Sequence, residues 1–545
     1  MENNQTKEKL LAEIDRLKKE LKKKKKYGLV WEDKPEDVVE MCKEKLPVLK
    51  EVKGKEIITD KNKPMNLLIE GDNYHALSVL NYIHKGKIDV IYIDPPYNTG
   101  NKDFKYNDRF VDKEDGFRHS KWLNFMGKRL KLAKNLLKIG GVIFISIDDN
   151  EQAQLKIICD NIFGESNFVS QVTWHRKRGK DNSAKYLSRV HEYILIYGRD
   201  VNKLVFNKID LSQQTLTQYT NPDGDVRGNY RKLALWRRGG QGGSKSFPFT
   251  TKEGLSVPSR SWLVNEDTMK RLDQENKLVV IGKGLYRKLF LSEHDGSIPE
   301  TIWLDVSNTA NATDMIKDIF GKSPFDTPKP IELIERILKI GGNKNSIVLD
   351  FMAGSGTTGH AVLKLNKEDN GDRKFILCTN NEELDSNGNK IKHKICSDVC
   401  YPRIEKVIKG YKNTKKENVA GLGGNLKYFK TDFVDYKEST DRNKIKLTKE
   451  AVEMLCVKEG TFELVLNNED FKIFKNHDHY AGIIFDQLAI EDFKKAIKGI
   501  KGKISVYIFS LGDDSFEDEF EDIKQKVKLS PIPEAILKVY RRIYK

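Results

Sequence analysis

Short apolar strands alternate with helices in two stretches of this chain, and this alternation constrains the fold more than any other feature. The first stretch predicts three strands, at residues 67–69, 88–93 and 142–147. A helix is expected after each of them, at residues 76–83, 120–137 and 152–162. Strands that alternate with helices pair in parallel through right-handed crossovers. The pattern therefore predicts an α/β fold built on a mostly parallel sheet.

The alternation stops near residue 170 and resumes near residue 326, and this interruption divides the chain. The α/β domain occupies residues 31–170 and 326–430, and residues 171–325 form an insert with irregular loops. Residues 431–545 predict a small α+β C-terminal domain. Residues 1–30 predict a charged helix whose apolar seam serves either dimerisation or packing on its own chain.

Charge and cysteine usage narrow the setting. The net charge of +16 favours a polyanionic partner, although a generally lysine-rich proteome would also produce it. Six cysteines without a regular framework indicate a reducing compartment. The spacing of His393, Cys396 and Cys400 fits one face of a helix, and no second ligand pair completes a metal site. Without a signal-peptide core or an apolar run of about 20 residues, a cytoplasmic protein is expected.

The tetrapeptide Asp94-Pro95-Pro96-Tyr97 follows the strand at 88–93, at the edge where parallel sheets bind ligands. The prolines lack amide hydrogens, so the backbone there offers rigid carbonyl acceptors. The Asp94 carboxylate and the Pro95 carbonyl can each accept one hydrogen of an exocyclic amine, which stabilises the charge that develops on nitrogen during methyl transfer. Tyr97 offers a flat ring to a base extruded from a duplex. Taken alone, the tetrapeptide also fits a proline-rich turn capped by aspartate.

A glycine-rich turn follows the strand expected at 346–351. The segment from Asp350 to Thr357 reads DFMAGSGT and leads into a helix, whose N-terminus favours an anionic group such as a carboxylate or a phosphate. Residues 354–359 also satisfy the G-x-G-x-x-G dinucleotide pattern, so this turn alone leaves nicotinamide binding open. An acid after the strand at 375–379, Glu382 or Glu383, would hold a ribose diol under either interpretation.

Together, these motifs resemble the beta-class amino-methyltransferases, and most closely the modification subunits of type III restriction–modification systems. The resemblance covers about residues 66–165 and 320–410, in the order catalytic motif, insert, cofactor motif. The matching segments are LIEGDNYHALSVL (68–80), IYIDPPYNTGNKDFKYNDRF (91–110), residues 122–153, SPFDTPKPIEL (323–333), residues 348–358 and EDNGDRKFIL (368–377).

The resemblance implies the Rossmann-like sheet of the class I S-adenosylmethionine-dependent methyltransferases. It implies that Asp94, Pro95, Pro96 and Tyr97 are catalytic and hold the target adenine. The residues that it assigns to S-adenosylmethionine are Asp72, Lys329, Pro330, Asp350, Phe351, Gly354, Ser355, Gly356, Thr357 and Glu382. No metal is required, because the sulfonium is already an activated methyl donor.

The insert at 171–325 corresponds in position to the target recognition domain of that family. Basic side chains in such a domain contact phosphates and read base edges. The candidates for DNA binding are Arg176, Lys177, Arg178, Arg237 and Arg238, each of which could instead be a solvated charge. By the same resemblance, the C-terminal domain is expected to meet a partner, either a second methyltransferase copy or a helicase–nuclease subunit.

The sequence thus predicts a site-specific methyltransferase that modifies N6 of a flipped adenine in double-stranded DNA, within a restriction–modification system. Aspartate rather than serine at position 94 favours adenine over cytosine. Methylation of cytosine N4 or of RNA, and a non-catalytic DNA-specificity subunit, are the alternatives. A dehydrogenase comes last, because it has no use for the tetrapeptide. The expected partners are double-stranded DNA, a second copy of the chain and a helicase–nuclease subunit, since the sequence has neither a nuclease constellation nor a phosphate-loop motif.

Overall fold

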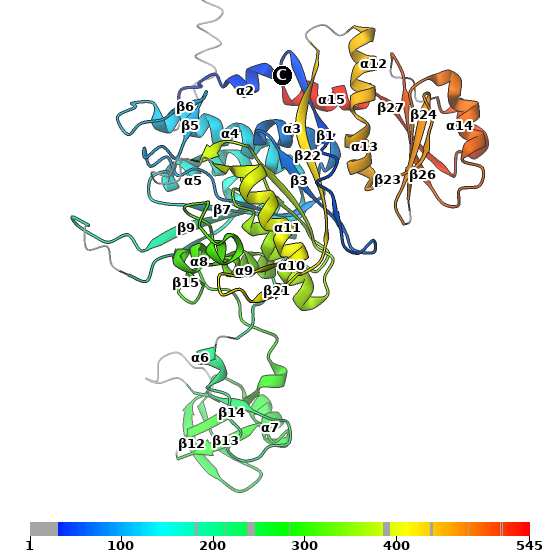
Figure 1. The fold of residues 1–545 in the computed structure, drawn as a ribbon. Helices are drawn as coiled ribbons and strands as arrows, with labels where there is room; N and C mark the ends of the chain where they lie inside the picture. Colours follow the sequence, from blue (N-terminus) through cyan, green and yellow to red (C-terminus); the bar gives the residue numbers. More distant parts are fainter. Residues whose placement is uncertain are drawn as a thin grey trace, which may run out of the picture. The chain divides into compact units, whose positions relative to one another are not determined.

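The computed structural model describes residues 31–179, 184–211, 213–236, 246–282, 284–384, 393–436, 440–477, 479–512, 514 and 516–544. An eleven-stranded sheet forms the centre of the largest part (Figure 1). Its spatial order is β1 (Lys45–Glu51), β22 (Asn425–Asp435), β3 (Met65–Glu70), β17 (Lys374–Thr379), β16 (Ile347–Asp350), β4 (Ile88–Ile93), β7 (Leu137–Ile147), β9 (His191–Gly198), β8 (Phe168–His175) and β15 (Ile302–Trp303), with β2 (Ile57–Ile58) beside β22. The strands from β22 to β7 pair in parallel, which confirms the predicted α/β sheet.

Helices cover both faces of this sheet (Figure 1). Successive side chains of a strand point to opposite faces. Accordingly, Ile143 and Ile145 of β7 lie in the buried cluster of the first helix group, whereas Val142 and Phe144 pack against Gly341 in the second. The first group is α3 (Asn73–Ile83), α4 (Arg118–Leu136) and α5 (Gln152–Phe163); the second is α9 (Ile331–Gly341), α10 (Thr357–Asp369) and α11 (Tyr401–Lys409).

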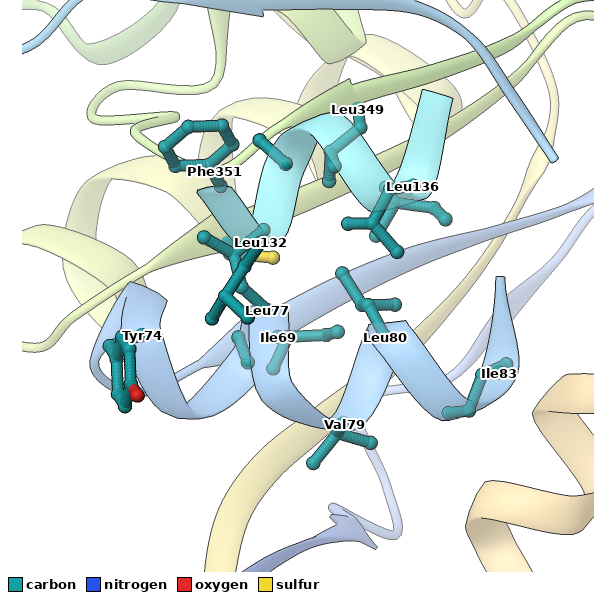
Figure 2. Packing of buried hydrophobic residues seen from close by; sticks show 14 of the residues in the cluster. Ile69, Tyr74, Leu77, Val79, Leu80, Ile83, Leu132, Leu136, Leu349 and Phe351 are labelled. Atoms are coloured by element: carbon teal, nitrogen blue, oxygen red, sulfur yellow. The ribbon is translucent and has the colours of Figure 1, made fainter. Parts of the chain in front are cut away.

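Tight packing under the first helix group fixes the strands that end at the candidate site. Leu77 and Leu80 of α3 lie beside Leu132 and Leu136 of α4, over strand residues that include Leu349 (Figure 2). These side chains are at most 5% exposed. Burying a leucine stabilises a fold by about 1.5–3 kcal/mol, so this layer holds β16 firmly beneath α3 and α4.

The compact second unit of the chain is shorter than the insert predicted at 171–325. It comprises Phe206–Glu300. Strands β8 and β9 join the central sheet through antiparallel pairing, and β15 pairs with β8. Trp174, expected in an irregular loop, is fully buried in β8. The strand was not predicted because the charged residues after β8 indicated a loop, whereas the spacing of the apolar residues indicated a strand.

This second unit contains its own small sheet and core. The sheet has the order β10 (Tyr230–Ala234), β14 (Gly284–Phe290), β13 (Leu278–Ile281), and β11 (Ser246–Thr250) forms a hairpin with β12 (Ser256–Ser261). Helices α6 (Gln213–Leu216) and α7 (Glu266–Gln274) complete it. Phe249, Trp262, Met269 and Leu285 form the centre of its core.

The C-terminal part carries a separate five-stranded sheet. Its order is β23 (Glu463–Asn467), β24 (Phe471–Lys475), β25 (Tyr480–Ile484), β26 (Ile504–Phe509) and β27 (Val527–Ile532). The helices of this part are α12 (Asp441–Glu450), α13 (Val452–Glu459), α14 (Ile490–Ala496) and α15 (Glu534–Ile543). Contacts of α13 and α15 with α3 join it to the central sheet, and the Tyr540 hydroxyl donates to the Pro47 carbonyl at 2.5 Å.

The sequence also led to expectations about the N-terminal helix, membrane-spanning helices and the C-terminal boundary of the α/β domain. The helix predicted at 1–30 lies outside the described residues. Within the described ranges, the helices are all too short or too polar to cross a bilayer. Strand β22 reaches Asp435, so the central sheet extends a few residues past the boundary predicted at 430.

Candidate active site

The two sequence motifs leave the sheet at the same edge. Strands β4 and β16 are adjacent and parallel, with Leu349 opposite Ile91. Asp94 follows the last residue of β4, and Asp350 is the last residue of β16. Because the carboxyl ends of parallel neighbours lie side by side, the acceptor tetrapeptide and the glycine turn face a common region.

A buried network of charges surrounds the acceptor tetrapeptide. The Lys329 ammonium donates to both Asp94 carboxylate oxygens at 2.8 Å and to the Tyr97 hydroxyl at 2.9 Å. The same ammonium lies 3.4 Å from Glu192, and the Tyr97 hydroxyl donates to Glu192 at 3.0 Å. Burial alone would lower the pKa of Lys329, but the Asp94 and Glu192 carboxylates raise it. Lys329 therefore remains a cation shared between two carboxylates.

Glu192 and the position of Lys329 escaped the sequence analysis. Glu192 lies in β9, and its side chain is 6% exposed. It also pairs with Arg176, whose Nε lies 3.4 Å from a Glu192 oxygen. The signal was an acid at the start of an otherwise apolar strand, a position that needs a buried partner. Lys329 was predicted to bind the cofactor, but its side chain lies at Asp94 instead.

The two proline carbonyls of the tetrapeptide differ in their hydrogen bonding. The Pro96 carbonyl accepts a hydrogen bond of 2.7 Å from the indole of Trp122, which is fully buried in α4. Within the described chain, no donor is bonded to the Pro95 carbonyl. The Pro95 carbonyl therefore keeps its capacity to accept a hydrogen bond, and its role toward a substrate amine stays a prediction.

The glycine turn contains one acid, Asp350, and glycines whose lack of a side chain lets a ligand approach the backbone closely. The Met352 amide and the Thr358 hydroxyl donate to Asp350 at 3.0 and 2.5 Å. Burial raises the pKa of Asp350 to about 7 against these hydrogen bonds, and the Asp94 charge adds to the rise. Gly354 and Gly356 have positive φ values of 49° and 81°, a conformation that favours glycine.

A second buried cation, Arg403 of α11, holds this turn. Its guanidinium donates to the hydroxyls of Ser355 and Thr357 at 3.0 and 2.8 Å. Burial lowers the pKa of Arg403 to about 10, and Nε has no partner among the described residues. Sequence reasoning missed Arg403 because about 45 residues separate it from the turn, and only the fold brings the two together.

The turn fits the methionine end of the predicted cofactor. Its glycines expose backbone, and the Asp350 carboxyl supplies a counter-charge for an ammonium group. Phe351 is fully buried beneath the turn, and Pro330 caps α9. A Cβ at Gly356 would come within 3.0 Å of the Cys400 sulfur, so the turn leaves room only for glycine there.

The other predicted cofactor residues already have partners. Asp72 caps α3 by accepting from the Tyr74 amide at 2.7 Å, and it pairs with Arg129 at 3.3 Å. Glu382 lies in the loop after β17, where it pairs with Lys105. Both acids follow parallel strands, β3 and β17, which lie on the same side of β16. They therefore lie on the cofactor side of the sheet edge.

The predicted DNA-binding residues fall into three groups. The Arg176 side chain points to Glu192, and its carbonyl accepts from the Thr309 amide at 3.1 Å. Lys177 and Arg178 are exposed after β8. Arg237 and Arg238 lie outside the described residues. Arg176 thus has a structural link to the acceptor tetrapeptide that the sequence did not predict.

The cysteine and histidine cluster forms a packed turn. Cys396 and Cys400 are buried in a π-helical turn, Ile395–Cys400, that leads into α11. The Cys396 sulfur lies 3.4 Å from the Tyr428 hydroxyl. Across the ranges that the structure covers, no three histidine, cysteine or acidic side chains are grouped to hold a metal ion.

Comparison with known families gives the site its context. The family described as DNA methylase (N6_N4_Mtase) matches residues 88–390, more than half of the chain, from the strand before Asp94 to the loop after β17. This chain belongs to the DNA methylase family. The predicted resemblance to amino-methyltransferases is therefore confirmed, and with it the predicted methyl donor, S-adenosylmethionine.

Named relatives of this DNA methylase come from restriction–modification systems. The StyLTI Mod subunit, a type III restriction-modification protein of Salmonella typhimurium, is 37% identical over 63% of this chain and 57% of its own length. The type III EcoPI Mod subunit of Escherichia phage P1 is 33% identical over 68% and 66%. The type II methyltransferase M.KpnI of Klebsiella pneumoniae is 33% identical over 64% and 89%. The chain spans less than two thirds of the two Mod subunits.

Proposed function

We propose that this DNA methylase transfers a methyl group to N6 of adenine at a specific site in double-stranded DNA, within a type III restriction–modification system. The observation that carries the proposal is the placement of two rigid acceptors, the Asp94 carboxylate and the Pro95 carbonyl, beside the Asp350 turn on one sheet edge. The relatives named as Mod subunits support the type III assignment.

The two acceptors suit an exocyclic amine. The nitrogen lone pair of adenine N6 is delocalised into the ring, so the free amine is a weak nucleophile. Hydrogen bonds from its two hydrogens to Asp94 and to the Pro95 carbonyl localise that lone pair and stabilise the positive charge that forms during attack. When bound, S-adenosylmethionine supplies an activated methyl group on sulfur. Tyr97, beside Asp94, provides a ring against which a flipped base stacks.

Lys329 competes with the amine for the Asp94 carboxylate. Its ammonium now occupies both Asp94 oxygens, with Glu192 only 3.4 Å away. We infer that Lys329 moves toward Glu192 when the adenine enters, so that a cation stays paired throughout. Glu192 is then a positioning residue: it acts through Lys329 and Tyr97 without touching the substrate. Arg176 links Glu192 to the end of β8, where Lys177 and Arg178 are exposed to a DNA backbone.

The proposal also assigns roles to the second unit, to the C-terminal sheet and to residues 1–30. The unit Phe206–Glu300 and the exposed residues that follow β8 would recognise the target sequence. The C-terminal sheet would meet a helicase–nuclease subunit, and residues 1–30 would support a dimer. Because the substrate is cellular DNA, the cytoplasm is the proposed place of action.

The experiment that tests the proposal is methylation-sensitive long-read sequencing of DNA from cells that express the chain. We expect N6-methyladenine at one recurring motif and unmodified DNA from cells that express Asp94→Ala. If N4-methylcytosine is found at a recurring motif instead, the substrate is cytosine and not adenine. Absence of any modified base, with folded protein present, would refute the assignment.

A further inference from the structure

A cavity of about 940 Å³ lies at the sheet edge opposite the candidate active site. Met65, Ile347 and Lys374, the first residues of β3, β16 and β17, line one wall. The other wall comes from the C-terminal part, at the end of α13 and at the end of β24. We call it the lysine cavity, because seven of its lining residues are lysines. Its volume is that of a site for a small molecule of nucleotide size.

The described acids of the lysine cavity each have a lysine or histidine partner in its own wall. The four pairs are Lys63–Asp372 at 3.3 Å, Lys427–Glu56 at 2.7 Å, Lys475–Glu463 at 3.2 Å and His479–Glu459 at 2.9 Å. Among the described residues, these four carboxylates are the only acidic side chains in the lining. Three of them have a lysine partner in the wall, and Glu459 also accepts hydrogen bonds from the Ser505 and Tyr507 hydroxyls.

Four lining lysines have no carboxylate within ion-pair distance among the described residues. They are Lys61, Lys87, Lys374 and Lys458. Lys458 lies over the Tyr82 ring at 3.9 Å. Burial lowers the pKa of Lys458 to about 8; Glu459 opposes this effect, and the nearby positive charge of Lys87 adds to it. Like charges gathered in a concave surface repel one another unless an anion lies between them.

His84 is a further unsatisfied group in the same wall. Its buried Nδ1 has no hydrogen-bond partner among the described residues. Burial, together with the charges of Lys87 and Lys374, lowers the pKa of His84 to about 3. Lys87 thus acts on both His84 and Lys458, and Lys374 acts on His84, so these side chains converge. A buried ring nitrogen without a partner is costly unless a ligand or water reaches it.

We propose that the lysine cavity binds a compact polyphosphate group, as carried by a nucleoside triphosphate. Three or four converging ammonium groups match the charge of a triphosphate, and lysine is a common phosphate ligand in proteins. Phe462 and Tyr480 in the lining offer rings for a base. A duplex cannot enter a cavity of this volume, so a small anion is favoured over DNA. The site is separate from the methyl-transfer edge and does not depend on the proposed function.

The test is calorimetric titration of the full chain with sodium tripolyphosphate and, separately, with ATP. We expect saturable binding of both by the wild type, and at least tenfold weaker binding by Lys87→Gln/Lys374→Gln/Lys458→Gln. Equal affinity for the two probes identifies the phosphates as the recognised group, and tighter ATP binding adds the base; both results support the site. Failure of the wild type to bind either probe overturns the proposal.

A charge-matched control separates the site from net charge. Lys270→Gln/Lys495→Gln/Lys524→Gln removes three exposed lysines that pair only within their own helical turns. This control should bind both probes as the wild type does, and an equal loss would overturn the proposal. Because Lys458 packs on Tyr82, the triple variant could be unstable. Lys61→Glu/Lys87→Glu changes only exposed side chains and should also abolish binding; wild-type affinity in this folded variant would overturn the proposal.

Discussion

The ends of strands β4 and β16 at the candidate site differ in the kind of interaction that their residues make. At the end of β4, four charged side chains of alternating sign, Asp94, Lys329, Glu192 and Arg176, form a chain whose two central members are buried. At the end of β16, one acid, Asp350, lies among glycine backbone and hydroxyls, and the buried cation Arg403 holds those hydroxyls in place. Charged side chains near the amine can change partners as the reaction proceeds. The backbone of the glycine turn has one conformation, which either accommodates a ligand or does not. The first corner is therefore suited to catalysis and the second to binding.

The largest effect should come from removing the acid of the β4 corner. Asp94→Ala takes away one of two acceptors for the amine and leaves Lys329 without its main partner. Loss of one preorganised hydrogen-bonding group costs about 10²–10³-fold in rate, so we expect methyl transfer to fall by at least that factor. Single-turnover assays with radiolabelled cofactor measure it.

Cofactor binding is the control for this variant. If the two corners have separate roles, calorimetry should give a cofactor affinity for Asp94→Ala within about threefold of the wild type. An equal loss of cofactor affinity and of rate would contradict the division. Asp94→Asn keeps the size of the side chain and should be nearly as inactive, because its neutral amide no longer offers a negative charge to the positive charge that develops on nitrogen.

Glu192→Gln should have the next largest effect. Glutamine keeps the size and can still accept from Tyr97, but it gives Lys329 no charge to move toward. Lys329 then stays on Asp94, and we expect kcat to fall by about 10–100-fold with little change in the KM for DNA. Steady-state kinetics on an oligonucleotide that contains the target site measure both parameters.

A double variant shows whether Glu192 acts through Lys329. Lys329→Met alone frees Asp94 and leaves a similar volume. If the ammonium is what blocks Asp94, the pair Glu192→Gln/Lys329→Met should be more active than Glu192→Gln alone, with a coupling of about 1 kcal/mol or more. Additive losses would indicate that Glu192 merely supports the fold at this position.

Sequence reasoning succeeded where the signal was local. Short apolar runs, prolines and glycines determine the strands before Asp94 and at Asp350 and the turn after each. The predicted bounds of these two strands agree with the structure to within a few residues. The neighbouring strand β7 begins about five residues before its predicted start. Glu192, Lys329 and Arg403 reach the site from a strand, a loop and a helix that are distant in sequence, so no spacing in the sequence could predict their contacts. The boundary of the insert failed for a related reason: β9 pairs with β7, and β8 pairs with β9 and with β15, which follows the second unit in the chain.

A smaller effect is expected at the β16 corner from Gly356→Ala. A non-glycine residue at φ 81° costs about 1–3 kcal/mol, and the new Cβ would meet the Cys400 sulfur at 3.0 Å. We expect cofactor affinity to fall about tenfold, with kcat at saturating cofactor nearly unchanged. Gly86→Ala is the matched control: its φ is 66°, nothing lies within 4 Å, and it is remote from the glycine turn. Similar cofactor loss in both variants would attribute the effect to general strain.

The smallest predicted effect is a pH dependence of cofactor binding. Asp350 has a pKa raised to about 7 by burial, so its carboxyl is mostly neutral at pH 6 and mostly ionised at pH 7.5. The ammonium of the cofactor's methionine end binds the ionised form better, and affinity should therefore rise by about fivefold across this interval, in which that ammonium remains largely protonated. The direction is the opposite of that expected from titration of the ammonium itself, which would weaken binding as pH rises. Asp350→Asn should bind more weakly and show no rise between pH 6 and 7.5. A wild-type affinity that stays flat across that range would mean that Asp350 does not change its ionisation there, and that the β16 corner presents a constant charge to the cofactor.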